Sequence, residues 1–214
     1  MVAALKSQWL RVVVHFGVWL PFAGIVRDAL TNRLNAEPIR DIILRTGNAA
    51  LVLLVLSLAC TPINTVFGFK SALKVRRALG LYAFFYAVAH ATMFIAVDYG
   101  LDIDLLKEAI LEKPYALVGA TAFLLLTPIA LTSTKGWMRR LGQRWTTLHR
   151  FVYLAALLVI VHFVWLVKLD VREPLTYGAI VTFLLVLRLR WIRQWISQLR
   201  SRLFLGVVKP AEMR

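Results

Sequence analysis

The sequence predicts an all-α integral membrane protein, a bundle of about six transmembrane helices with both termini in the cytoplasm. Three observations lead to this prediction. Of the 214 residues, 60% are hydrophobic and the mean hydropathy is +0.71, which exceeds the share of about 45–50% that is usual for soluble domains. The apolar residues gather in six long runs, and the connections between the runs alternate between basic and acidic.

The six apolar runs lie at residues 12–26, 47–66, 78–97, 115–132, 151–167 and 175–189. In a bilayer each run must be helical, because lipid offers the backbone no other hydrogen-bond partner. The first run is short and contains Pro21, and we interpret it as a retained helix rather than a signal peptide. The sixth run is the weakest because Arg188 and Arg190 interrupt it, and we expect these two side chains to snorkel to the cytoplasmic headgroups.

The charged residues predict the orientation. Most lysines and arginines fall in the N-terminal stretch, in the connections after the second and fourth runs, and in the tail; ten of the 11 acids, including Asp28 and Asp41, fall in the other connections. The positive-inside rule makes the basic side cytoplasmic. This explains the net charge of +15 without a nucleic-acid partner, so the partner predicted by composition is the lipid bilayer.

We expect a single membrane domain over residues 1–214 with a short basic cytoplasmic tail at 190–214. This tail is too short for a nucleotide-binding domain, which needs βαβ units of about 30 residues or more. Segment 101–112 alternates acidic and apolar residues and predicts a short amphipathic helix on the outer surface. A weak internal repeat joins Thr61-Pro62-Ile63 to Thr127-Pro128-Ile129, where we expect the second and fourth helices to end.

The histidines are the candidate functional residues. All four, His15, His90, His149 and His162, lie within or at the ends of apolar runs, where ionisable groups are costly and usually functional. At a rise of 1.5 Å per residue, His90 and His162 lie at the same depth, slightly to the outer side of the bilayer centre. Two such imidazoles can bind a haem iron from both sides.

Other readings of the same residues remain open. Ala83, Ala87 and Ala155 share faces with His90 and His162 and leave room for a flat macrocycle, but ordinary close packing of helices needs the same small residues. His149 lies near the cytoplasmic boundary, and it is a candidate for a second haem, a flavin or a quinone headgroup. A small transporter, or a structural subunit whose histidines only join helices, are the alternative functions.

The motifs resemble one family closely. They are Arg77-x-Leu79-Gly80-Leu81 leading to His90, the stretch from Gly136-Trp137 through Arg139-Arg140-Leu141-Gly142 and Leu148-His149-Arg150 to Tyr153, then His162, and Pro38-x-x-Asp41-Ile42 with Thr46-Gly47. Together they resemble the MsrQ (YedZ) family of haem-binding membrane subunits in the ferric-reductase-like transmembrane group. The likeness covers nearly the whole chain.

The resemblance implies an electron-transfer subunit in the bacterial inner membrane. It would pass electrons from the quinone pool through one or two b-type haems to a periplasmic molybdenum-containing MsrP-type subunit, which reduces methionine sulfoxide in oxidised proteins. FMN is also attributed to the family. His90, His149 and His162 match its haem-ligand candidates. Related NADPH oxidases carry two histidines on the third helix, whereas here the residue 14 positions after His90 is Asp104.

Without a nucleotide domain or an outer domain, electrons must enter from a quinone or a donor protein and leave to a partner. A quinol-oxidising activity would follow if the chain takes them from quinol directly. We expect the acidic outer segment 98–112 to dock the partner by charge complementarity; a merely solvated loop is the alternative.

Overall fold

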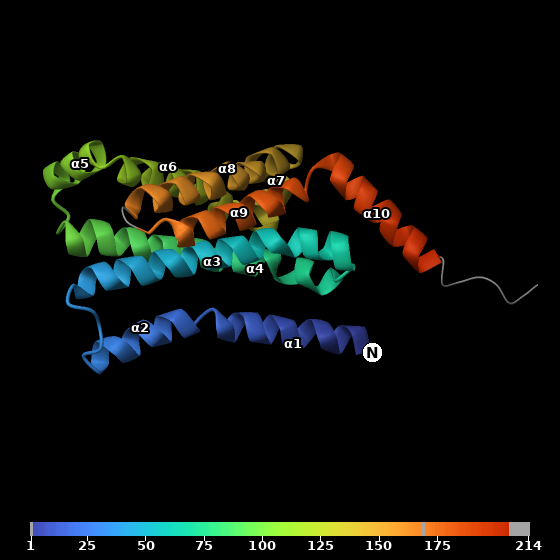
Figure 1. Ribbon diagram of the computed structural model, residues 1–214, viewed down its shortest axis with the longest axis horizontal. Helices are drawn as coiled ribbons and strands as arrows, with labels where there is room; N and C mark the ends of the chain where they lie inside the picture. Colours follow the sequence, from blue (N-terminus) through green and yellow to red (C-terminus); the bar gives the residue numbers. More distant parts are fainter. Residues whose placement is uncertain (1, 168–169, 206–214) are drawn as a thin grey trace, which may run out of the picture.

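The computed structural model, which describes residues 2–167 and 170–205, is a bundle of long helices with no strand in that part of the chain (Figure 1). The elements are α1 (Val2–Gly17), α2 (Leu20–Leu30), α3 (Pro38–Phe67), α4 (Lys70–Thr92) with its π-helical continuation η1 (Met93–Asp98), α5 (Ile103–Glu112), α6 (Pro114–Leu131), α7 (Lys135–Leu141), α8 (Gln143–Leu166), α9 (Arg172–Val186) and α10 (Arg190–Leu205). The all-α prediction is confirmed.

Five helical segments are long and apolar enough to cross a membrane: 8–30, 38–67, 70–98, 114–131 and 143–166. The α9–α10 pair gives a sixth when it is taken as one span with a bend of 75°. The chain begins at the same end of the bundle where α10 lies, and α5 lies at the opposite end (Figure 1). The expected segment 101–112 is thus confirmed as helix α5, whose first turn is capped by the Asp102 carboxylate.

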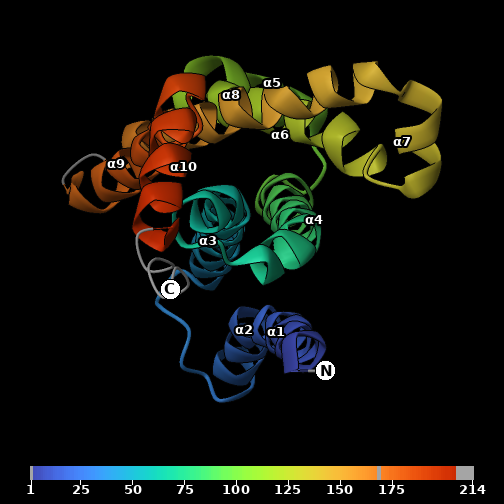
Figure 2. The ribbon, with the colours of Figure 1, turned by 90° about the vertical axis from the view of Figure 1, so that its right-hand side faces the viewer.

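Two antiparallel hairpins form the body of the bundle. α3 packs mainly on α4, and α6 packs mainly on α8. Figure 2 shows α3 and α4 between the α1–α2 unit on one side and the layer of α6, α8 and α9 on the other. The core is centred on α3, whose leucines Leu51, Leu53, Leu54 and Leu58 are all less than 7% exposed. Many large apolar side chains on the outer faces are exposed, as expected for residues that contact lipid.

The first span is a broken helix. Pro21 has no backbone N–H and lies in the first turn of α2, so the chain cannot continue the hydrogen-bond ladder of α1. The Tyr86 hydroxyl of α4 fills the gap: it donates to the Val18 carbonyl (2.7 Å) and accepts from the Phe22 N–H (3.2 Å). Tyr86 is 1% exposed. One buried hydroxyl therefore joins the break in the first span to the α3–α4 hairpin.

Arg188 differs from the expectation. It does not snorkel to the headgroups but turns into the bundle, where it donates to the Tyr153 hydroxyl and to the Leu58 carbonyl, both at 2.6 Å. Pro62 explains the second bond: it lies inside α3 and cannot donate to the carbonyl four residues earlier, which is that of Leu58. Arg188 supplies the missing donor. Arg190 is exposed.

Two further expectations need correction. The Thr-Pro pairs at 61–62 and 127–128 do not end their helices, because α3 continues to Phe67 and α6 to Leu131. The tail is helical from Arg190 to Leu205, and its remaining residues 206–214 lie outside the described part.

Two acids assigned to connections also lie elsewhere. Asp28 and Asp41 are in α2 and α3, buried to 8% and 7% exposure, where the Arg45 guanidinium contacts them at 2.6 and 2.9 Å. Burying a carboxylate is tolerable only when it is paired in this way. The three side chains tie α2 to α3 at the end of the bundle opposite the N-terminus.

Candidate functional site

His90 of α4 and His162 of α8 face each other across the bundle. Their ring centres are 6.2 Å apart and the ring planes are nearly perpendicular, at 86°. α4 packs mainly against α3, and α8 packs mainly against α6. The expectation that these two imidazoles share a depth and can meet is therefore confirmed.

Each imidazole is held by a backbone carbonyl of the neighbouring helix. His90 Nδ1 lies 2.8 Å from the Ile43 carbonyl of α3, and His162 Nδ1 lies 2.7 Å from the Tyr115 carbonyl of α6. A carbonyl only accepts, so both Nδ1 atoms must carry the proton, and the lone pair of each neutral ring is on Nε2. A hydrogen bond of this kind fixes the tautomer and orientation of a metal-binding histidine.

A glycine lies against each ring. A methyl group built on Gly47 would be 3.0 Å from His90 Nδ1, and one on Gly119 would be 2.6 Å from His162 Nδ1. Both distances are shorter than a normal contact, so each imidazole rests on the bare backbone of the preceding helix. Gly119 leaves no room for a side chain beside its ring, and at Gly47 a side chain would fit only if His90 shifted by a few tenths of an ångström.

The two half-sites repeat each other. The carbonyl acceptors at 43 and 115, the glycines at 47 and 119 and the histidines at 90 and 162 are each 72 residues apart. This is not the spacing of the predicted Thr-Pro repeat. Sequence reasoning missed Ile43, Gly47, Tyr115 and Gly119 as supports. The signal that could have found them is the glycine that precedes each histidine by 43 residues.

The pair suits a haem iron. A metal–nitrogen bond of about 2.0 Å, with about 1.1 Å from that nitrogen to the ring centre, separates two opposed imidazole centres by about 6.2 Å. The observed 6.2 Å matches this span. Two neutral, oriented imidazoles with free Nε2 lone pairs are also the donor set of bis-histidine haem proteins. Among the described residues, no three side chains of His, Cys, Asp or Glu converge as a metal site would need.

The small residues beside the histidines do not separate the two readings left open for them. Ala83 is 3% exposed and Ala155 is 0% exposed, and both are covered by protein. This is the environment that close packing of helices requires. Ala83 belongs to the core cluster with Leu79 and Tyr86, so it supports the position of α4 whether or not a macrocycle lies nearby.

His149 does not join the pair. It lies in α8, 13 residues or about 20 Å of helix before His162. Its Nε2 is 3.2 Å from the Thr132 hydroxyl, and its ring stacks on Trp145 with centres 3.9 Å apart. His15 is exposed on α1 and bonds the Tyr82 hydroxyl through Nδ1 at 2.8 Å. Asp104 lies in α5, away from α4.

A side-chain hydrogen bond, here called the clasp, lies at the α5 end of the site. Lys113, just before α6, donates to the Tyr99 hydroxyl just after η1, at 2.7 Å. This bond raises the pKa of Lys113 above its usual value, although the lysine lies at the surface. The clasp joins the segment that follows His90 to the segment that supplies the Tyr115 carbonyl. The π-helical η1 begins three residues after His90, and such segments occur frequently at functional sites.

The chain is similar in sequence to several known proteins. Residues 46–160 match the family model described as ferric reductase like transmembrane component. The chain is 43% identical over 181 residues to the protein-methionine-sulfoxide reductase heme-binding subunit MsrQ of Xanthomonas campestris pv. campestris strain 8004, which covers 82% of this chain and 83% of that protein. The MsrQ of Xanthomonas axonopodis pv. citri is 45% identical over the same shares. That of Herminiimonas arsenicoxydans is 38% identical over 86% of each chain. No solved structure matches significantly.

Proposed function

The chain belongs to the MsrQ family of haem-binding subunits, within the ferric-reductase-like transmembrane proteins, and from this premise we propose that it conducts electrons across the membrane through a haem b held between His90 and His162. The observation that carries the proposal is the opposed pair of imidazoles, 6.2 Å apart and each fixed through Nδ1. We infer the cofactor from the names of the relatives and its two ligands from the geometry of the imidazole pair.

The chain's own residues would do three things for a bound haem. His90 and His162 bind the iron through Nε2, and the Ile43 and Tyr115 carbonyls hold the rings in the binding tautomer. The covering helices exclude water, which influences the reduction potential together with the hydrogen bonds to the ligands. The haem supplies one-electron transfer between ferric and ferrous iron. With two histidines to hold the iron, the site would favour electron transfer over binding of a further ligand to a bound haem.

The position of the pair supports a proposal for where electrons leave. Ile43 and Tyr115 lie near the first turns of α3 and α6, at the acidic end of the bundle. We propose that this end faces the periplasm of a bacterial inner membrane and delivers electrons to an MsrP-type molybdenum-containing subunit, which repairs oxidised methionines. The acidic segment 98–112 is the proposed docking surface. Replacing Asp98, Glu108 and Glu112 by amides should slow transfer at low salt and leave the haem spectrum unchanged; an unchanged rate rejects this surface.

The basic end is where we propose that electrons enter. The quinone pool is the proposed source, and FMN is a proposed second cofactor. His149, stacked on Trp145, is the histidine nearest that end within α8 and is the candidate contact for a second haem, a flavin or a quinone. These proposals rest on family membership together with the location of His149.

Haem quantitation of single variants tests the central proposal. Purified protein should show a b-type spectrum, and His90→Ala and His162→Ala should each lose the haem that the pair binds. Folding of the variants is checked by circular dichroism in detergent. A well-folded His90→Ala variant with the full haem content and spectrum of the wild type would contradict the assignment. A colourless wild-type protein after expression with excess haem precursor would favour a transporter or a structural subunit.

A further inference from the structure

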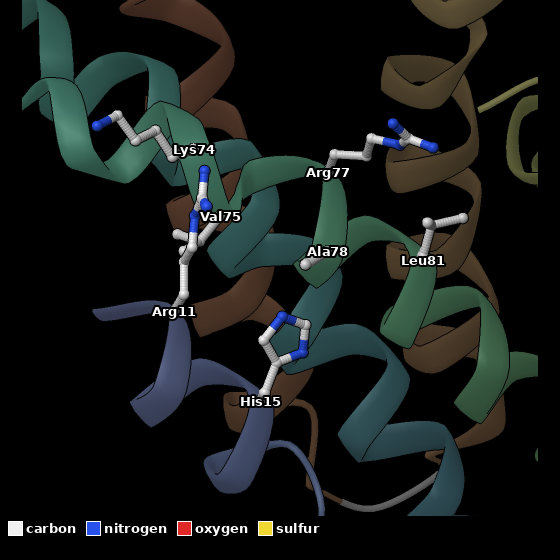
Figure 3. A pocket seen from close by; sticks show the side chains of 7 residues that line it. All are labelled: Arg11, His15, Lys74, Val75, Arg77, Ala78 and Leu81. Atoms are coloured by element: carbon white, nitrogen blue, oxygen red, sulfur yellow. The ribbon is translucent and has the colours of Figure 1, made fainter. Parts of the chain in front are cut away.

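A cavity of about 290 Å³ lies at the basic end, between α1 and α4, and its lining residues on α4 precede His90 by nine residues or more. Figure 3 shows Arg11 and His15 reaching from α1 toward α4, with Lys74 and Arg77 on α4 to either side. The remaining lining is apolar and includes Val75 and Leu81. None of the described residues that line the cavity is acidic.

The charged residues that line the cavity favour an anion as its ligand. Three side chains that are permanently cationic, Arg11, Lys74 and Arg77, surround one cavity. Guanidinium and ammonium groups bind phosphate oxygens strongly, the arginines in a bidentate manner. His15 adds a ring N–H donor: when the Tyr82 hydroxyl donates to its Nδ1 (2.8 Å), a ring proton is on Nε2.

The position of the cavity relative to the membrane favours a lipid as its ligand. Arg11 and Lys74 lie within the first turn or two of spans that begin at Gln8 and Lys70. The apolar residues Ala78 and Leu81 follow deeper along α4 than Lys74 and Arg77, and Leu81 lies about 10 Å beyond Lys74. The cavity is thus basic at the membrane boundary and apolar toward the hydrocarbon. This is the order of polarity of a phospholipid, with a phosphate above and acyl chains below.

We propose that this cavity binds the phosphate of an anionic phospholipid of the same leaflet. Arg11 and Lys74 contact the phosphate from α1 and α4, His15 donates a further hydrogen bond, and the acyl chains lie along Ala78 and Leu81. Bound in this way, the lipid joins the first span to the α3–α4 hairpin at the basic end, as Tyr86 does deeper in the membrane. The proposal does not depend on the function proposed above.

Native mass spectrometry of the purified full chain in detergent micelles tests the site. Phosphatidylglycerol and phosphatidylcholine of matched chains are titrated separately, and haem content and circular dichroism are recorded as checks of folding. One phosphatidylglycerol should bind the wild type in clear preference to phosphatidylcholine. Because each basic residue near anionic lipid contributes about five-fold in affinity, the Arg11→Gln, Lys74→Gln double variant should lose about 20- to 30-fold.

A matched variant and a soluble anion sharpen the result. Arg150→Gln removes an exposed arginine of α8 that does not line the cavity, and it should keep the wild-type affinity. Equal losses in Arg150→Gln and the double variant, or equal binding of the two lipids, would overturn the site. Inorganic phosphate is titrated at constant ionic strength in phosphatidylcholine micelles. If it binds as tightly as phosphatidylglycerol and is lost in the double variant, the phosphate contacts stand and the lipid assignment is overturned.

Discussion

The α3–α4 and α6–α8 hairpins are alike at one end of the bundle and different at the other. Near α5, both use a carbonyl, a glycine and a histidine in the same arrangement. Toward the basic end the likeness disappears: the residue 72 positions before His149 is Arg77, and the one 72 positions after Tyr86 is Leu158. The shared end presents two equivalent imidazoles, which we propose as ligands to one haem iron, whereas the divergent end is where each hairpin packs against different neighbours.

The difference has a physical reason. A bis-histidine site needs the same ligand geometry from two sides, so the two hairpins are constrained to the same support for each ring. No such constraint acts where the α3–α4 hairpin meets α1, α2 and α10, and the α6–α8 hairpin meets α7 and α9. Replacing equivalent residues in the two hairpins tests this account. The effects of these replacements should decrease with distance from the residues that support the imidazoles.

The largest effect should come from the glycines under the rings. Gly119→Ala places a methyl group 2.6 Å from His162 Nδ1, so the ring must move off the Tyr115 carbonyl. We expect haem affinity to fall by about 10- to 100-fold, the usual cost of losing the partner that orients a metal ligand. Haem titration of the apoprotein, followed at the Soret band, measures this change.

The equivalent variant of the first hairpin is the comparison. Gly47→Ala meets His90 Nδ1 at 3.0 Å, so it should weaken haem binding in the same way but less. Gly24→Ala is the control because a methyl group there has no neighbour within 4 Å; it should leave haem affinity unchanged. If Gly24→Ala lost as much haem as Gly119→Ala, the contact between the glycine and the imidazole would have no specific role in haem binding.

The residues that support the two imidazoles show how much of the site could be predicted from the sequence alone. The helical spans and the shared depth of His90 and His162 follow from apolar runs and from the rise per residue, which are local properties. The carbonyls of Ile43 and Tyr115 could not be found in this way, because a backbone acceptor leaves no mark in residue type. Gly47 and Gly119 are visible in the sequence, but their role depends on a contact between helices.

The same limit explains the error at Arg188. An arginine near the end of an apolar run is normally expected to reach the headgroups. Its actual partner is the Leu58 carbonyl, left without a donor by Pro62 in another helix. Pro62 is evident in the sequence, and so is the carbonyl it leaves without a donor. Which side chain comes to that carbonyl is decided by tertiary packing, 130 residues away along the chain.

The Tyr86 hydroxyl should have the next largest effect, and on stability rather than on haem. Tyr86→Phe leaves the Val18 carbonyl and the Phe22 N–H without their partner at a buried break. We expect a loss of about 1–3 kcal/mol in the free energy of unfolding, measured in mixed micelles. Tyr82→Phe is the matched control: its hydroxyl bonds the exposed His15, so its loss should be smaller. Equal losses would place the effect in the aromatic rings and not in the bridging hydroxyl.

A smaller effect should connect Arg188 with Pro62. Arg188→Met removes the donor to the Leu58 carbonyl, and Pro62→Ala restores a backbone N–H that can take its place. The two changes together should therefore cost less than the sum of their separate costs, by about 1 kcal/mol in a double-mutant cycle of unfolding.

Pro128 provides the matching test in the other hairpin. It lies inside α6 as Pro62 lies inside α3, but Arg188 donates to α3 and to Tyr153 of α8. Pro128→Ala should then be additive with Arg188→Met to within about 0.5 kcal/mol. Coupling of the same size for both prolines would mean that Arg188 acts on the bundle as a whole and not on one carbonyl.

The smallest effect on the paired site should come from His149. This residue bonds Thr132 and stacks on Trp145, about 20 Å of helix from His162, so it contributes no axial ligand to a haem between His90 and His162. His149→Ala should keep the low-spin, bis-imidazole electron paramagnetic resonance signal of that haem, with total haem measured in parallel by the pyridine haemochrome. A decrease in total haem with this signal retained would assign a second haem to the basic end. Loss of the signal itself, in a variant folded by circular dichroism, would instead show that the two ends of the bundle are one site and that the comparison between them does not hold.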